Sequence, residues 1–198
     1  MKNKITIQER ALGSLFFLSF KDLCVTLGQR SIFSNISFNV SYNNILLIKG
    51  PVGSGKSTLL KILAGFIKIK SGVFSHTENN VPVKCVYVHS QPEFNFITGY
   101  VNDEVILSGA NSELFTEFLG KSVYDMSGGQ LKKLSIMIAI SAYKDCVLLL
   151  DEPFDMLDDQ QADNMAKFIL TESKTRPFII ATHDDYFDNI ADAIINID

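Results

Sequence analysis

The hydrophobic pattern from residue 45 onward alternates short apolar runs with helical apolar patterns. Residues 146–150 and 177–182 are nearly continuous apolar runs, typical of parallel strands that are covered on both faces. Shorter runs predict strands at 45–49, 84–88 and 193–197, and the apolar spacing predicts helices at 56–64, 128–142 and 159–173. Strands that alternate with helices in this way predict an α/β domain with a parallel sheet.

The earlier part of the chain has a different pattern. From about residue 15 to 49, β-forming residues cluster or alternate between turn residues at 28–30 and 43–44, which predicts antiparallel strands. The apolar run Leu12–Phe20 follows basic residues, but it lacks a small-residue cleavage pattern and is too short to span a bilayer. We interpret it as a first strand region after a leader of unknown structure, so membrane attachment is expected through a partner.

The segment from 91 to 126 differs again. It contains loop sequence followed by two short helical patterns, around 101–107 and 112–119.

Composition narrows the class of protein. A chain of 198 residues suits one α/β domain, and its net charge of −4 lacks the basic footprint that nucleic-acid binders usually carry. We therefore expect no nucleic-acid partner. The three cysteines are far apart in apolar stretches, which favours buried thiols in a reducing cytoplasm over a metal site or a disulfide framework.

A phosphate-binding loop stands between the first predicted parallel strand and the helix that follows it. The motif G-x-x-x-x-G-K-S is matched by Gly50, Pro51, Val52, Gly53, Ser54, Gly55, Lys56 and Ser57. Backbone N–H groups of such a loop cradle phosphate oxygens, and the helix N-terminus adds a positive dipole end. Lys56 is predicted to reach the β- and γ-phosphates, Ser57 to bind Mg²⁺ and Thr58 to add a phosphate contact.

Two adjacent carboxylates follow the apolar run 147–150. The strand brings Asp151 to its carboxyl end beside the phosphate loop, where it can hold Mg²⁺ directly or through water. Glu152 then faces the γ-phosphate and can orient and deprotonate the attacking water.

A third motif lies between these two. Ser127, Gly128, Gly129 and Gln130 alone would suit an ordinary serine-capped helix start. Together with the phosphate loop, Gln91, Asp-Glu-Pro at 151–153, Leu157-Asp158 and Thr182-His183-Asp184, in this order, they resemble the ATP-binding cassette (ABC) family, whose signature is Leu-Ser-Gly-Gly-Gln. The resemblance extends from about Leu18 to the end of the chain.

This resemblance implies a fold and a set of site residues. The fold is an ABC-type nucleotide-binding domain of the P-loop NTPase class, a single domain over 1–198 with an antiparallel β-subdomain and a short helical subdomain at about 92–142. Gln91 matches the glutamine that touches Mg²⁺ and the water and senses the membrane partner. The signature at 127–130 contacts the γ-phosphate held by the opposite subunit. Asp158 matches the aspartate that links the two sites of the dimer in this family, and His183 matches the histidine that bonds the γ-phosphate.

The implied function is that of an ATP-hydrolysing motor subunit. It would bind ATP and Mg²⁺, pair with a second ABC ATPase subunit (identical or homologous), and dock on an integral membrane transport subunit at the inner face of the cell membrane. Non-transport ABC ATPases usually carry coiled-coil insertions or two fused cassettes, which this chain lacks, and no guanine-reading Asn-Lys-x-Asp motif is present. Residues 91–105 look like those of energy-coupling-factor importer ATPases, the subfamily we favour, whereas the small size and the missing base-stacking aromatic are also similar to haem-exporter ATPases.

Three positions depart from the family pattern. Met126 replaces the signature leucine, and Leu27 stands where an aromatic residue usually stacks on adenine. The segment between Gln91 and Ser127 is shorter than usual, which implies a reduced docking surface for the membrane subunit.

Overall fold

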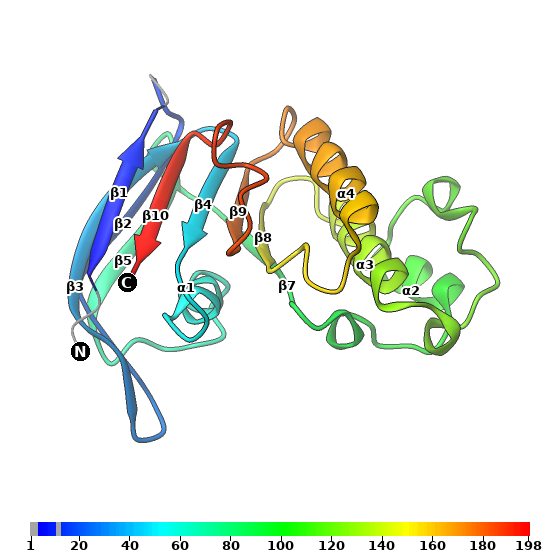
Figure 1. Cartoon of the computed structure of the whole chain (residues 1–198), viewed down its shortest axis with the longest axis horizontal. Helices are drawn as coiled ribbons and strands as arrows, with labels where there is room; N and C mark the ends of the chain where they lie inside the picture. Colours follow the sequence, from blue (N-terminus) through cyan, green and yellow to red (C-terminus); the bar gives the residue numbers. More distant parts are fainter. Residues whose placement is uncertain (1–3, 11–12) are drawn as a thin grey trace.

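The computed structural model describes residues 4–10 and 13–198, which form two β-sheets and a group of helices (Figure 1). The central sheet has the strand order β1-β10-β4-β9-β8-β7. Its last five strands are parallel, and β1 pairs antiparallel with β10 at the edge. The strands are β1 (Ile5–Glu9), β4 (Ile45–Lys49), β7 (Cys85–Val88), β8 (Val147–Asp151), β9 (Phe178–Ala181) and β10 (Ala193–Ile197). The predicted α/β class with a parallel sheet is confirmed.

The second sheet is antiparallel, with the order β3-β2-β5-β6. Its strands are β2 (Phe16–Leu27), β3 (Arg30–Tyr42), β5 (Ser71–Glu78) and β6 (Val81–Pro82). The predicted antiparallel strands and the turn after Leu27 are confirmed, whereas β1, β5 and β6 were not predicted. The apolar run predicted as a first strand region belongs to β2 from Phe16 onward, and its first residue, Leu12, lies outside the described residues.

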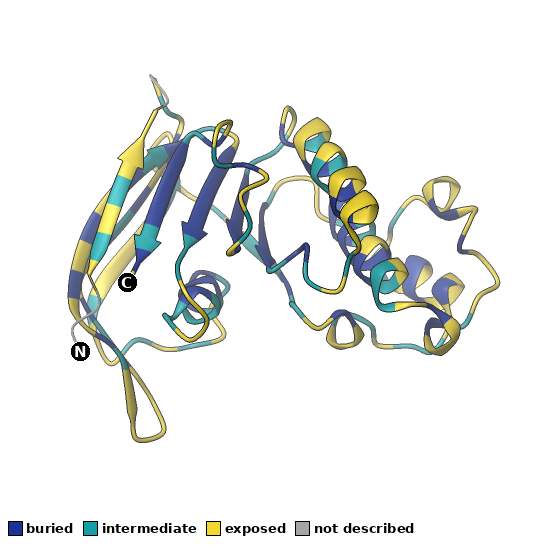
Figure 2. Ribbon diagram, in the orientation of Figure 1, coloured by how far each residue is buried: buried dark blue, intermediate teal, exposed yellow. Residues whose placement is uncertain are grey.

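Alternation along the central strands separates two cores. Leu46 and Ile48 of β4 face helix α1 (Lys56–Leu63) and the second sheet, whereas Ile45 and Leu47 face the opposite side. On that opposite side lie α3 (Gly128–Ala142) and α4 (Asp159–Glu172). Helix α1 is therefore sandwiched between the sheets, and Figure 1 shows α3 and α4 across the central sheet from it. Figure 2 shows these central strands as mostly buried.

A third, smaller core lies between α3 and the segments that precede it. These are the 3-10 helix η1 (Pro92–Asn95), the α-helix α2 (Val101–Ser108), and the 3-10 helices η2 (Ser112–Phe115) and η3 (Val123–Asp125). The helical pattern predicted around 112–119 is the short 3-10 helix η2 followed by turns, and both Phe115 and Phe118 belong to this core. Among the described residues, no helix combines the length and the apolar character needed to cross a bilayer.

Candidate nucleotide-binding site

The phosphate loop connects β4 to α1 and owes its shape to glycine. Gly50, Gly53 and Gly55 all have positive φ angles, of 151°, 83° and 109°. A side chain at Gly55 would place its Cβ only 2.6 Å from Cζ of Phe33, so this position must approach the second sheet without a side chain. The loop therefore wraps the N-terminus of α1, where free N–H groups and the helix dipole favour an anion.

Lys56, the first residue of α1, is 5% exposed. Its Nζ donates to the carbonyl oxygens of Gly50 (2.8 Å) and Pro51 (3.4 Å) and lies 3.0 Å from Oε1 of Glu152. The ammonium group is thus held over the phosphate loop by weak acceptors and one carboxylate. Phosphate oxygens in the loop would compete with these partners for the same charge.

Asp151 and Ser57 form the oxygen-rich part of the site. Asp151 is 3% exposed and accepts hydrogen bonds from Ser57 Oγ (2.9 Å) and from Tyr87 OH (2.6 Å). Burial and the bond to Asp151 raise the pKa of Tyr87, so its hydroxyl remains a donor. A hydroxyl beside a carboxylate offers the hard oxygen ligands that Mg²⁺ prefers, so these two residues fit the predicted metal. Tyr87 was not predicted from the sequence.

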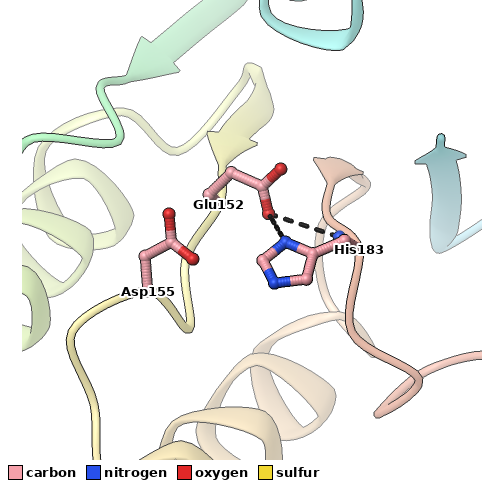
Figure 3. Close-up of side chains that lie close together, drawn as sticks. All are labelled: Glu152, Asp155 and His183. Atoms are coloured by element: carbon pink, nitrogen blue, oxygen red, sulfur yellow. Dashed lines mark hydrogen bonds and ion pairs between the residues drawn. The ribbon is translucent and has the colours of Figure 1, made fainter. Parts of the chain in front are cut away.

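The side chains of Glu152 and His183 lie side by side (Figure 3). The Glu152 carboxylate accepts from the backbone N–H of His183 at 3.3 Å, and its Oε2 lies 3.1 Å from His183 Nδ1. Asp155, which the sequence analysis did not single out, lies beside them. One ligand atom from each of the three side chains lies within 4.8 Å of the others. Burial, together with the Glu152 charge, raises the pKa of Asp155.

A cleft of about 400 Å³ is lined by Lys56, Ser57, Glu152, Asp155 and His183. Its far wall is formed by Leu27, Arg30 and Ile32 of the second sheet, and its floor by the phosphate loop. Arg30 Nη2 reaches the carbonyl oxygen of Gly53 at 3.4 Å. In the part of the chain that the structure describes, this wall offers a base an alkyl surface and one cation but no aromatic ring.

The remaining predicted site residues lie elsewhere. Ser127 is the N-cap of α3, where its hydroxyl and the Gln130 side chain form a capping box, and Asp158 caps α4. The side chain of Gln91 is exposed just after β7. The residues that line the cleft include none of the predicted set Gln91, Ser127, Gly128, Gly129, Gln130 and Asp158. Within one chain, the structure therefore brings together the phosphate loop, the two carboxylates and His183, but not the signature.

Of the two signature glycines, Gly129 is the more closely packed. A Cβ at Gly129 would lie 2.6 Å from Oε1 of Gln161 and 3.1 Å from Cδ2 of Leu157 on the neighbouring segment. A side chain at Gly129 would therefore have to displace the end of the Gln161 side chain and crowd Leu157.

Comparisons with known proteins agree with this geometry. The family model of the ABC transporter matches residues 33–155. The ABC transporter ATP-binding protein MG467 of Mycoplasma genitalium is 30% identical over 195 residues, which cover 84% of this chain and 62% of that protein. The zinc import ATP-binding protein ZnuC of Ehrlichia ruminantium is 26% identical over 200 residues, which cover 94% of this chain and 81% of that protein. The energy-coupling factor transporter ATP-binding protein EcfA of Aster yellows witches'-broom phytoplasma is 29% identical over 203 residues, which cover 90% of this chain and 74% of that protein.

A solved structure shares the fold. The ABC transporter ATP-binding protein from Pyrococcus furiosus superposes with a TM-score of 0.71 at 20% identity, covering 91% of this chain and 96% of that one. The match of the family model covers more than half of the chain, and it includes the phosphate loop, the signature and both carboxylates. The chain therefore belongs to the ABC transporter family, as one of its ATP-binding, ATP-hydrolysing subunits.

Proposed function

We propose that this chain is one half of an ATP-driven motor that closes on a second ABC ATPase subunit, identical or homologous. The observation that carries the proposal is the separation of the two halves of the site. Lys56 lies in the cleft on one face of the central sheet, whereas Ser127 begins a helix that packs on the other face. A second subunit must therefore bring its signature to the γ-phosphate.

The residues of one cleft would then divide the work. Lys56 and the loop amides hold the β- and γ-phosphates. Lys56 Nζ lies 3.0 Å from Glu152 Oε1 in the structure, and the phosphate oxygens would draw it away from that carboxylate. The released carboxylate orients a water molecule and takes its proton, while His183 keeps its contact with Oε2. Ser57 and Asp151, joined by Gln91 from the segment after β7, would hold Mg²⁺, which neutralises charge on the phosphate oxygens.

The coupling surface is proposed to lie on the segment 92–142. Large apolar side chains there are exposed to solvent, including Ile97 (88%), Ile106 (75%) and Tyr124 (85%). Such side chains are more typical of a contact surface than of a free one. We assign them to an integral membrane transport subunit, which would place this chain on the cytoplasmic face of a membrane. One relative is named as a zinc import ATP-binding protein and another as an energy-coupling factor transporter ATP-binding protein, and with the resemblance of residues 91–105 this favours an importer of the energy-coupling-factor type.

The experiment that tests the proposal separates binding from chemistry. Lys56→Ala should weaken ATP binding, because it removes the charge that faces the β- and γ-phosphates. Glu152→Gln should leave ATP binding intact while lowering turnover by about 100-fold or more, since an amide cannot accept the proton of water. Both are measured by nucleotide titration and by phosphate release, with Lys68→Ala at an exposed lysine as the control. A Glu152→Gln protein that turns over ATP at the wild-type rate would exclude Glu152 as the base.

A further inference from the structure

A fully buried lysine lies between the signature helix and the catalytic glutamate. Lys132 is in the second turn of α3 and is 1% exposed. Its Nζ donates to the carbonyl oxygen of Glu152 at 3.0 Å and to the carbonyl oxygen of Ser90. One side chain thus joins three segments that are far apart in the sequence: the helix that begins with the signature, the residue before Gln91, and Glu152 itself.

The contact with Glu152 falls at an unusual point of the backbone. Glu152 has a φ of 46°, in the left-handed region that residues with a side chain seldom adopt. This turn directs the Glu152 side chain toward Lys56 and His183 while its carbonyl faces α3. Hydrogen bonds hold both backbone groups of Glu152. Its N–H donates to the Ala181 carbonyl oxygen at 2.8 Å, and its carbonyl oxygen accepts from Lys132 Nζ and, at 3.3 Å, from the Asp155 N–H.

The contact with Ser90 fixes the start of the segment that carries Gln91. The neighbouring His89 is already held on both sides, because Asn95 accepts from its N–H and donates to its carbonyl. The Gln91 N–H donates to His89 Nδ1 at 3.0 Å. Lys132 therefore bonds to a stretch of backbone that has little freedom to move independently.

A charge at this depth needs compensation. Burial lowers the pKa of Lys132, against the attraction of the carboxylates of Asp155, Asp151, Glu152 and Glu93. Keeping a desolvated ammonium group here is costly, and a buried charge is retained where its hydrogen bonds specify one arrangement. Lys133, the next residue, shows the alternative, since it is exposed and pairs with Glu117 at 2.6 Å.

We propose that Lys132 is a positioning residue for ATP hydrolysis, which holds the backbone of Glu152 in its catalytic turn and ties that turn to the signature helix and to the segment of Gln91. The proposal rests on the proposed function, because it assumes that Glu152 is the base. Its physical content is that movement of α3 when the subunits close is transmitted to the base through one ammonium group. Lys132 does not line the nucleotide cleft, so it acts through Glu152 rather than on ATP.

The test compares Lys132→Met, Lys132→Arg and the control Lys133→Met. In Lys132→Met, kcat should fall by about 10- to 100-fold, because small displacements of a catalytic group cost that much, while the ATP dissociation constant changes little. Lys132→Arg keeps the charge and the donors and should recover a large part of kcat. Lys133→Met should behave as wild type. Thermal unfolding with and without Mg-ATP establishes that each protein is folded and binds nucleotide.

The outcomes separate this proposal from the proposed function. A folded Lys132→Met protein with wild-type kcat overturns it, as does a loss of ATP affinity equal to the loss of kcat. If Lys132→Met does not fold, Lys132→Gln replaces it, and wild-type kcat in that variant overturns the proposal in the same way. If Glu152→Gln hydrolyses ATP at the normal rate, the proposed function fails first, whatever the Lys132 variants do.

Discussion

The two carboxylates at the end of β8 differ in their surroundings because the backbone turns between them. Asp151 is still in the strand, and its side chain points to Ser57 and Tyr87. Glu152, one residue later, has a positive φ, so its side chain points to Lys56 and His183. Neighbouring residues of the same charge type thus face different partners, which suits one to holding a cation and the other to accepting a proton.

At this scale the sequence predicts residues that belong to a local motif and misses those that arrive through the fold. The phosphate loop and the Asp-Glu pair were predicted because each motif is continuous in the sequence. Tyr87 reaches Asp151 because β7 and β8 are neighbours in register, and Lys132 reaches Glu152 because α3 packs behind β8. Neither residue has a local pattern that distinguishes it from an ordinary strand tyrosine or helix lysine.

Leu27 leads to a prediction about the base. It is 41% exposed and lines the cleft with Arg30 and Ile32, where an alkyl surface gives contact but lacks the stacking geometry of a ring. The ATP and GTP dissociation constants should therefore differ by less than about tenfold, and Leu27→Tyr should tighten both by about two- to tenfold. Fluorescence titration of both nucleotides checks this. A preference for ATP of a hundredfold or more would mean that another residue reads the base.

At the scale of elements, predictions were best where the periodicity was strong. The helix predicted at 128–142 is observed with the same bounds, because a capping serine starts it and a continuous apolar pattern fills it. Strand β5 was missed, since seven of its eight positions are not fully buried and its sequence is largely polar. Strand β1 was missed because only its antiparallel pairing with β10, far along the chain, holds it in place.

The contact between the antiparallel sheet and the central sheet includes the buried side chain of His76. His76 of β5 is 7% exposed, and its Nε2 lies 2.7 Å from the hydroxyl of Tyr42, while Cys85 Sγ lies 3.4 Å from its Nδ1. Burial lowers the pKa of His76 to about 4. The folded state therefore prefers the neutral ring, so the stabilisation is present above the unfolded pKa and is lost as the pH falls toward 4.

This gives a prediction for stability. Between pH 7 and pH 5 the wild-type free energy of unfolding should drop by about 2 kcal/mol through His76 alone, because the unfolded histidine, with a pKa of about 6.5, binds the proton first. His76→Gln should lack that part of the drop, although it will be less stable at pH 7. Urea unfolding of both proteins at the two pH values measures the difference. Parallel losses in the two proteins would show that His76 is not the titrating group.

At the scale of the whole molecule, the position of the cleft is the basis for the proposed composite site. The cleft opens between the two sheets, while the N-termini of α3 and α4, with Ser127 and Asp158, lie outside it. The resemblance to the ABC family predicted a composite site, and this stays a prediction. The identity of the second subunit depends on surfaces that no local motif encodes.

The last prediction concerns assembly. The wild-type chain alone should be mostly monomeric and nearly inactive until two copies, or this chain and a homologous one, close on ATP, because each cleft lacks the partner's signature. Glu152→Gln should dimerise in Mg-ATP but not in ADP, since the γ-phosphate joins the two subunits and cannot be hydrolysed. Adding Ser127→Arg to the Glu152→Gln protein should block dimerisation, because the arginine adds bulk and charge at the signature. The control substitution Ser112→Arg, at an exposed serine outside the signature, should not block it.

Light scattering at several protein concentrations, with thermal unfolding to show that each variant is folded, measures this assembly. Activity per chain should rise with protein concentration in the wild type, because two chains are needed for each pair of sites. A Glu152→Gln protein that stays monomeric in saturating Mg-ATP would show that a homologous subunit or the membrane subunit is required to complete the site. A high wild-type rate of ATP hydrolysis that does not depend on protein concentration, in a protein that remains monomeric, would exclude the composite site. In such a monomer the signature would play no part, because Ser127 cannot reach the phosphate loop of its own chain without rearranging the packing of α3 on the central sheet.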